Sequence, residues 1–150
     1  MKKLLVTFCV IIIAVTMTVS ATAGDKTLFG SKEKYDRAEA SLLMGLQSDN
    51  EGLRESAAYM LGELKSEKAV IPLMSMLKCD GSQTSRVVAA LALCRIGDAR
   101  GSYAVKQAVQ FDENRLVQHR CAWFYNEYVQ AGTFAFRSED GTTHIDLAIR

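Results

Sequence analysis

The side chains that most often carry chemistry are sparse in this sequence. It has two histidines, His119 and His144, but no His-Glu pair, no glycine-rich phosphate loop and no Gly-x-Ser-x-Gly nucleophile motif. His119 and Glu127 are eight residues apart on one predicted helix, which is too far along the helix axis for an acid–base pair. The sequence therefore predicts no catalytic residue, no metal site and no cofactor, and we expect a protein that is not an enzyme.

Three cysteines, Cys79, Cys94 and Cys121, follow the amino-terminal segment. Three thiols cannot all pair, and their spacings match no metal-binding pattern such as Cys-x-x-Cys. Cys94 and Cys121 fall on predicted helices, where related segments of the chain have small residues, so we interpret them as small buried hydrophobic residues. One disulfide is an alternative in an oxidising compartment. A catalytic thiol is disfavoured because no histidine or acid supports it.

Residues 1–23 have the three-part pattern of a secretory signal peptide. Two lysines precede an uncharged, mostly apolar run at residues 4–19, and Ala21 and Ala23 form a small-residue cleavage site. The run is about 16 residues long, shorter than the roughly 20 residues that span a membrane comfortably, which favours a cleaved signal over an anchor. We expect cleavage after Ala23, a periplasmic or secreted protein, and no membrane span in the mature chain.

Length and composition point to one globular domain. The chain has 150 residues, of which 49% are hydrophobic and 23% charged. Two of its 18 basic residues lie in the leader, whereas all 17 acidic residues follow it, so the remaining chain is close to neutral. This balance gives no electrostatic basis for binding nucleic acid or an anionic membrane.

A helical segment that recurs about every 32 residues organises the chain. Arg54–Leu64 reads Arg-Glu-Ser-Ala-Ala-Tyr-Met-Leu-Gly-Glu-Leu, and Arg86–Ile96 reads Arg-Val-Val-Ala-Ala-Leu-Ala-Leu-Cys-Arg-Ile. A more divergent copy, Gln118–Tyr128, follows at the same interval and has Cys-Ala in place of the Ala-Ala pair. A second helical segment lies between copies, so the repeating unit is a helix pair. The sequence predicts an all-α fold: a short α-solenoid of three antiparallel helix pairs over residues 32–131.

The pattern also predicts the bounds of the helices and a different structure for the tail. The expected helices span residues 32–47, 53–64, 67–77, 84–96, 99–111 and 115–130. In the tail, residues 132–150, two alternating runs flank Asp140-Gly141, which is a hairpin turn signal. A two-residue turn there would pair Phe136 with Ile145 and Phe134 with Leu147. The alternative is a flexible tail.

The two clearest copies resemble HEAT repeats, and more closely the short HEAT-like repeats named for phycobilisome lyases. The resemblance covers roughly residues 35–130 and rests on Arg54, Ala57, Ala58, Leu61, Gly62, Leu64, Ala69, Pro72 and Leu73, and on Arg86, Ala89, Ala90, Leu93, Ile96, Gly97 and Asp98. It implies a stack of helix pairs and says little about function, because such repeats serve unrelated tasks. Di-iron hydroxylases built on related repeats are not matched, since their His-Glu ligands are absent.

In HEAT-like stacks the second helix of each pair lines the concave side, where we expect a partner to bind. A helical wheel centred on Ala57 assigns Leu53, Leu61 and Leu64 to the core and turns Glu55, Tyr59 and Gly62 outward. The equivalent outward residues are Val87, Leu91 and Cys94, then His119, Trp123 and Asn126, flanked by Glu63, Arg95 and Glu127. Two alternatives are that the hairpin covers this row or that the row belongs to the core.

These patterns lead to three hypotheses of function. We expect an exported, non-catalytic scaffold or binding module for a protein or peptide partner, with the outward row as its contact surface. The alternatives are an accessory factor to an enzyme, similar to a chromophore-protein lyase, and a purely structural component of the cell envelope. Arg54 and Arg86 are interpreted as structural residues that tie the turns around Asp49 and Asp80 to the stack, with ligand binding as the alternative.

Overall fold

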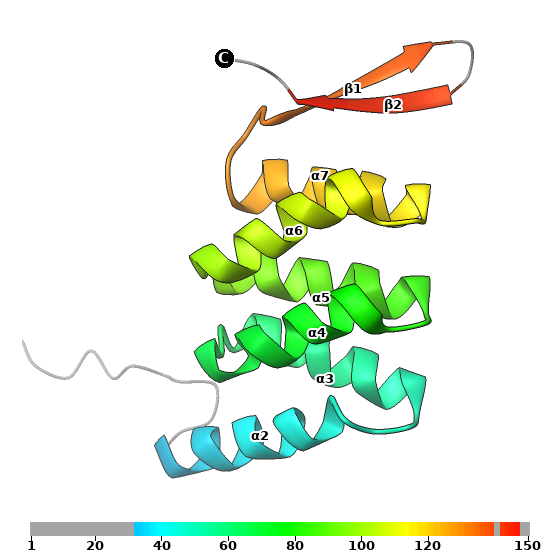
Figure 1. Ribbon diagram of the computed structural model, residues 1–150. Coiled ribbons are helices and arrows are strands. Elements are labelled where there is room, and N and C mark those ends of the chain that lie inside the picture. The colour runs from blue at the N-terminus through cyan, green and yellow to red at the C-terminus, as the bar shows by residue number, and fades with distance from the viewer. Residues whose placement is uncertain (1–31, 140–141, 148–150) are drawn as a thin grey trace, which may run out of the picture. The chain divides into compact units, whose positions relative to one another are not determined.

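The computed structural model describes residues 32–139 and 142–147, and this part of the chain is mostly helical (Figure 1). The predicted all-α class is confirmed for it, and none of the described helices is long and apolar enough to cross a membrane. The predicted leader and the Asp140-Gly141 turn lie outside the described residues. The helices are α2 (Lys32–Gly45), α3 (Glu51–Glu63), α4 (Val70–Cys79, after the 3-10 turn η1, Glu67–Ala69), α5 (Gln83–Ile96), α6 (Ala99–Phe111) and α7 (Arg115–Tyr128).

The helices begin and end at residues that satisfy their free backbone groups. Asn50, Ser82 and Asn114 occupy equivalent positions in the three copies, and the side-chain oxygen of each accepts a backbone N–H from the first turn of α3, α5 or α7. At the other end of α5, Gly97 adopts the left-handed conformation with φ of 77°, as its type and place predict. Short capped turns thus separate the helices.

The helices of Asp36–Arg150, the second of two units into which internal contacts divide the chain, pack in two groups. In the first group α3 packs against α5, and α5 packs against α7. In the second group α4 packs against α6, while α4 contacts α5 and α6 contacts α7. Figure 1 shows α4 and α6 in front of α5 and α7. The core between them contains fully buried Leu61, Leu73, Leu93, Val105 and Val117.

Small residues let α3, α5 and α7 approach closely. The predicted small pairs, Ala57-Ala58, Ala89-Ala90 and Cys121-Ala122, are all buried. Gly62 is buried as well, and a Cβ atom on it would lie 2.7 Å from the Cα of Ala92 on α5. The prediction that Gly62 points outward is therefore wrong, because this residue lies at the closest approach of α3 to α5, where any side chain would collide with backbone.

Leu53 also departs from its prediction, since 52% of its surface is exposed instead of lying in the core. Its equivalents in the next two copies, Ser85 on α5 and Val117 on α7, are fully buried. The same contrast holds between Met60, which is exposed, and its buried equivalent Ala92. The side of the helix that these positions occupy is covered on α5 by α3, but α3 is the first helix of its group in the described chain.

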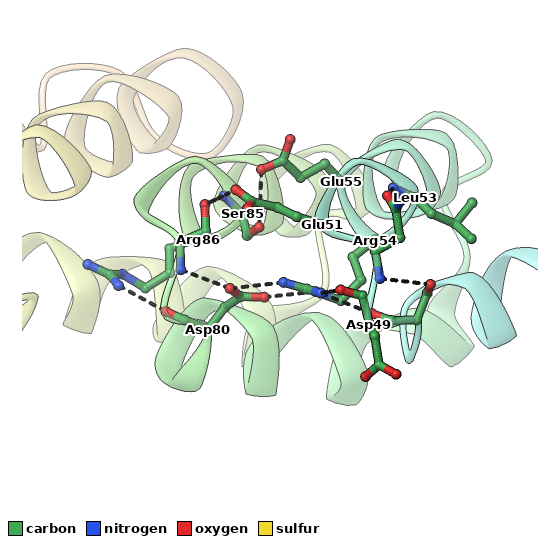
Figure 2. Close-up of polar contacts among 11 residues, drawn as sticks. Asp49, Glu51, Leu53, Arg54, Glu55, Asp80, Ser85 and Arg86 are labelled. Atoms are coloured by element: carbon green, nitrogen blue, oxygen red, sulfur yellow. Dashed lines mark hydrogen bonds and ion pairs between the residues drawn. The ribbon is translucent and has the colours of Figure 1, made fainter.

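Two arginines connect successive turns in one ladder (Figure 2). The Nε atom of Arg54 donates to Asp80 Oδ2 at 3.1 Å, while its Nη1 donates to the carbonyl oxygens of Ser48 and Asp49. Arg86 repeats the arrangement one unit later: Nε donates to Asp112 Oδ2 at 3.1 Å, and Nη1 donates to the Asp80 carbonyl at 2.9 Å. The predicted contacts of both arginines with the turns around Asp49 and Asp80 are observed: Arg54 contacts the Asp49 carbonyl and the Asp80 carboxylate, and Arg86 contacts the Asp80 carbonyl.

The ladder ends where the sequence changes. Gln118 occupies the arginine position in the third copy, and its Nε2 donates to the Asp112 carbonyl at 2.6 Å. At the other end, Ser48 occupies the position of Asp80 and Asp112, and its hydroxyl accepts the Asn50 N–H at 3.1 Å. The neutral residues keep the contacts within each turn but provide no charge for a further rung.

The tail forms the predicted hairpin. Strands β1 (Phe134–Glu139) and β2 (Thr142–Leu147) are antiparallel, and their register pairs Phe136 with Ile145 and Phe134 with Leu147, as expected. The backbone N–H and C=O of Phe134 both bond to the side-chain amide of Asn126 on α7, at 3.0 and 2.8 Å. The Phe134 ring is buried edge-on against Tyr125. These contacts attach β1 to α7.

A buried carboxylate anchors α2. Glu39 is 4% exposed and accepts hydrogen bonds from the Ser66 hydroxyl and from Lys68 Nζ, each at 2.6 Å. The hydrogen bond from Lys68, followed by that from Ser66, lowers the pKa of Glu39 from its ordinary value of 4.5, although burial alone would raise it. The charged form of Glu39 thus stabilises the junction between α2 and η1.

Removing Arg86 should destabilise the protein far more than removing an exposed arginine. The Arg86→Ala variant leaves the Asp112 carboxylate, whose side chain is 7% exposed, without its cationic partner, and we expect a loss of about 3–5 kcal/mol in the free energy of unfolding. Arg100→Ala is the matched control, because Arg100 pairs with Asp98 at the surface and its side chain is 59% exposed. Urea unfolding measures both, and similar midpoints for the two variants would contradict the ladder's structural role.

The Glu39 contacts predict an acid-sensitive contribution to stability. Because the folded-state pKa is depressed, this contribution is fully present above about pH 4.5 and is lost as the pH falls through the folded-state value. Glu39→Gln should therefore lower stability at pH 7 and flatten its decline between pH 5 and pH 3. Asp36→Asn, at an exposed carboxylate on the same helix, should keep the wild-type profile. Identical profiles for Glu39→Gln and wild type in pH-dependent urea unfolding would exclude this role.

Candidate binding surface

The predicted contact residues of α3, α5 and α7 lie at equivalent positions on three helices that pack side by side. Tyr59, Leu91 and Trp123, here called the aromatic row, occupy the same place in the three copies of the repeat. Tyr59 is 43% exposed and Trp123 is 47% exposed, while Leu91 on the central helix is half-buried and packs against the core. Large aromatic side chains at the two outer helices therefore remain accessible to a partner.

Arg95 contacts two tyrosine rings, Tyr59 of the aromatic row and Tyr128 of α7. The Arg95 guanidinium lies 4.9 Å from the centroid of the Tyr59 ring and 5.8 Å from that of Tyr128, and it forms an ion pair with Glu63. Partial burial acts to lower the pKa of Arg95, but its hydrogen bonds with both tyrosines and the Glu63 charge raise it, so the group stays cationic. We call Arg95, Glu63, Tyr59 and Tyr128 the arginine cluster.

The remaining predicted contact residues differ in accessibility. Val87 is half-buried and Glu127 is exposed. His119 is half-buried because its ring packs on Phe136 of β1, with centroids 4.7 Å apart. One edge of the predicted surface is thus in contact with the hairpin, while Trp123, one helical turn further along α7, keeps nearly half of its surface exposed.

Two residues that the helical wheel turned outward face neighbouring elements. Cys94 is 2% exposed, and Asn126 holds the backbone of Phe134. Both are equivalent to Gly62, and the contacts of Gly62 with α5 and of Asn126 with β1 show that this position points along the row of helices toward the next element. A wheel drawn for one helix distinguishes core from solvent, but it carries no information about neighbours on either side.

Tyr128 is the member of the arginine cluster that the sequence did not reveal. In the repeat it is equivalent to Ile96, the residue after Arg95, and its side chain reaches back to the guanidinium. The equivalent positions in the other copies hold Leu64 and Ile96, so the aromatic character of the third copy was the only available signal.

Two hollows lie away from the aromatic row. One, of about 470 Å³, lies between α4 and α6 and is mainly apolar, lined by residues that include Met74, Leu77, Tyr103, Ala104 and Phe111. The other, of about 370 Å³, is polar and includes Cys79, Lys78 and Arg86. Among the described residues, no group of three or more His, Cys, Asp or Glu side chains could hold a metal ion.

The three described cysteines have free thiols in two environments. Cys79 is exposed, whereas Cys94 and Cys121 are buried, as their interpretation as small hydrophobic residues requires. Burial raises the pKa of the Cys94 thiol to about 12. Burial, together with the neighbouring Cys94 and Asp112, also raises the pKa of Cys121. Since the thiolate is the reactive form, the two buried thiols are poor nucleophiles.

Comparison of the sequence with models of protein families and with curated proteins finds no match. Exposed aromatic rings, an ordered arginine and flanking carboxylates are suited to recognition by contact, and they form no nucleophile–base arrangement.

Thiol labelling should separate the cysteines by environment. We expect iodoacetamide at pH 8 to modify Cys79 in the native protein and to leave Cys94 and Cys121 unmodified until urea is added, because the latter are buried and their pKa values are raised. Peptide mapping by mass spectrometry identifies each site. Rapid native modification of Cys94 or Cys121 would contradict the packing of α5 against α7.

Proposed function

We propose that this protein is an exported, non-catalytic HEAT-like repeat module that binds a protein or peptide partner through the aromatic row. The observation that carries the proposal is the exposure of Tyr59 and Trp123 on the outer two of three packed helices, with the Tyr59 ring held by Arg95. Tyrosine, tryptophan and arginine are the residues most often found at the energetic centres of protein interfaces.

The repeated contacts support a solenoid of helix pairs. The ion pairs Arg54–Asp80 and Arg86–Asp112 each join residues 26 apart, and the second pair follows the first at the interval of the sequence repeat. The capping residues follow the same interval. A unit that repeats its turn contacts, its caps and its small-residue pairs is expected to repeat its orientation as well, which would align α3, α5 and α7 along one surface.

The side chains of the arginine cluster contact one another before a partner binds, and this arrangement favours binding. Side chains lose rotamer freedom when a partner covers them, at a cost of about 0.5–1.5 kcal/mol for each flexible side chain. Tyr59 and Tyr128 already contact the Arg95 guanidinium, and Glu63 neutralises its charge, so part of this freedom is lost before binding. The aromatic surface is therefore preorganised.

Export is part of the proposal and is supported by the sequence of residues 1–23. The basic start, the apolar run and the Ala-x-Ala site have the order of a secretory signal. The partner is accordingly expected in the periplasm, in the envelope or outside the cell.

One observation favours the accessory-factor hypothesis as a second candidate. The apolar hollow of about 470 Å³ between α4 and α6 has the volume of a small-molecule site, and the hollow containing the exposed Cys79 shares Lys78, Phe111 and Asp112 with it. A chromophore-sized ligand bound there would be displaced by Ala108→Trp, which fills the hollow. A purely structural envelope role would involve neither surface.

Substitutions in the aromatic row should reduce capture of the partner. Trp123→Ala removes an exposed anchor and Leu91→Glu places a charge at the centre of the row, and we expect each to lower recovery of the captured partner from an envelope fraction at least ten-fold. Ile71→Ala is the matched control, because Ile71 is 58% exposed but lies on α4 and lines neither hollow. Unchanged recovery by both folded row variants, judged by circular dichroism, would refute the proposed surface.

A further inference from the structure

We propose that the partner presents to the aromatic row a segment in the polyproline II conformation, with an apolar residue at every third position. This inference rests on the proposed function and specifies the chemistry of the partner. It concerns Tyr59, Leu91 and Trp123 together with the two charged residues that flank Trp123 on α7.

The spacing of the helices selects this conformation. Packed helices have axes roughly 8–10 Å apart. Because α3, α5 and α7 pack in succession and the three row residues are equivalent on them, we expect these residues to recur at about that distance. A polyproline II helix has three residues per turn and rises about 3.1 Å per residue, so the same face recurs about every 9 Å. A β-strand repeats its face about every 6.7 Å, and an α-helix repeats its turn about every 5.4 Å. A polyproline II segment that crosses the helices therefore places one side chain over each row residue.

The chemistry of the row agrees with this geometry. Proline-rich segments dock on surfaces lined by aromatic side chains, and their conformation is largely formed before binding, so little entropy is lost. Tyr59 and Trp123 expose aromatic rings at the two ends of the row, with the apolar Leu91 between them. The contact of Arg95 with Tyr59 limits the movement of one of these rings.

The charged residues beside Trp123 predict which charges the bound segment carries. Arg120 precedes Trp123 by three residues and Glu127 follows it by four, so the two lie on either side of Trp123 along the exposed face of α7. Both are exposed, and neither forms an ion pair with another residue in the described part of the chain. Arg95, in contrast, is already paired with Glu63. In a polyproline II segment, the residues before and after the one facing Trp123 project to opposite sides. A basic residue toward Glu127 and an acidic residue toward Arg120 would complement this surface.

Two synthetic peptides test the inference with the full chain. Both are fluorescent, proline-based nonapeptides with three leucines and one basic and one acidic residue beside the last leucine, prepared in both orders of charge. In the first peptide the leucines occupy the first, fourth and seventh positions; in the second they occupy the first, third and fifth. We expect fluorescence anisotropy to show at least ten-fold tighter binding of the first peptide. Equal affinity for the two spacings, or no binding of either, overturns the inference.

Variants assign the binding to the row. Trp123→Ala should weaken binding of the first peptide at least ten-fold, whereas Ile71→Ala, at an exposed residue of α4, should leave it unchanged. Glu127→Lys should weaken it as well, and a peptide with an acidic residue in place of the basic one should recover the loss. Absence of this charge rescue contradicts the assigned flank. If the captured envelope partner depends on Trp123 but the first peptide does not compete with it, the polyproline II inference fails while the proposed function stands.

Discussion

The ladder of Arg54, Asp80, Arg86 and Asp112 is the constraint on which the rest of the structure depends. Each arginine binds a carbonyl of the turn before its own helix and the carboxylate of the next turn, so it ties its helix to a turn one repeat further along the chain. Because the guanidinium is planar and bonds at two atoms, the contact sets an orientation as well as a distance. Small residues then allow the helices to pack closely, so Tyr59, Leu91 and Trp123 lie at equivalent positions on neighbouring helices.

The hairpin packs at the carboxyl-terminal end of the described repeats, and its position determines which surface of α7 stays open to a partner. At the carboxyl-terminal end Asn126 and Tyr125 bind β1, so the hairpin covers the side of α7 that corresponds to the contact of α3 with α5. The hairpin also contacts the predicted binding residue His119, through Phe136. The Phe134 ring is therefore buried against α7, and Trp123 remains exposed.

The sequence predicted the parts of this fold that depend on periodic residues. The order of the helices, the Gly97 cap, the turn contacts of the arginines and the hairpin register all follow from local patterns with known physical causes. Some helix bounds differ from their predictions: α3 spans Glu51–Glu63 instead of 53–64, and α4 spans Val70–Cys79 instead of 67–77. The errors concern contacts with neighbouring elements. Gly62, Cys94 and Asn126 face the next helix or strand, whereas Leu53 lies on a side of α3 that no described helix of its group covers. A helical wheel drawn for one helix does not include the elements packed beside that helix, so it could not predict these contacts. Tyr128 was missed because the third copy has diverged from the pattern.

Exposure of Trp123 is the most direct test of the account, because a row held in register by the ladder and left open by the hairpin must present this side chain to solvent. Trp123 is the single tryptophan of the chain, so its fluorescence reports on this site alone. The measurement is acrylamide quenching of the native full-length protein, with the urea-unfolded protein as reference. We expect red-shifted emission that acrylamide quenches readily in the native state. Blue-shifted emission that is protected until the protein unfolds would show that the row is covered, and would contradict the account.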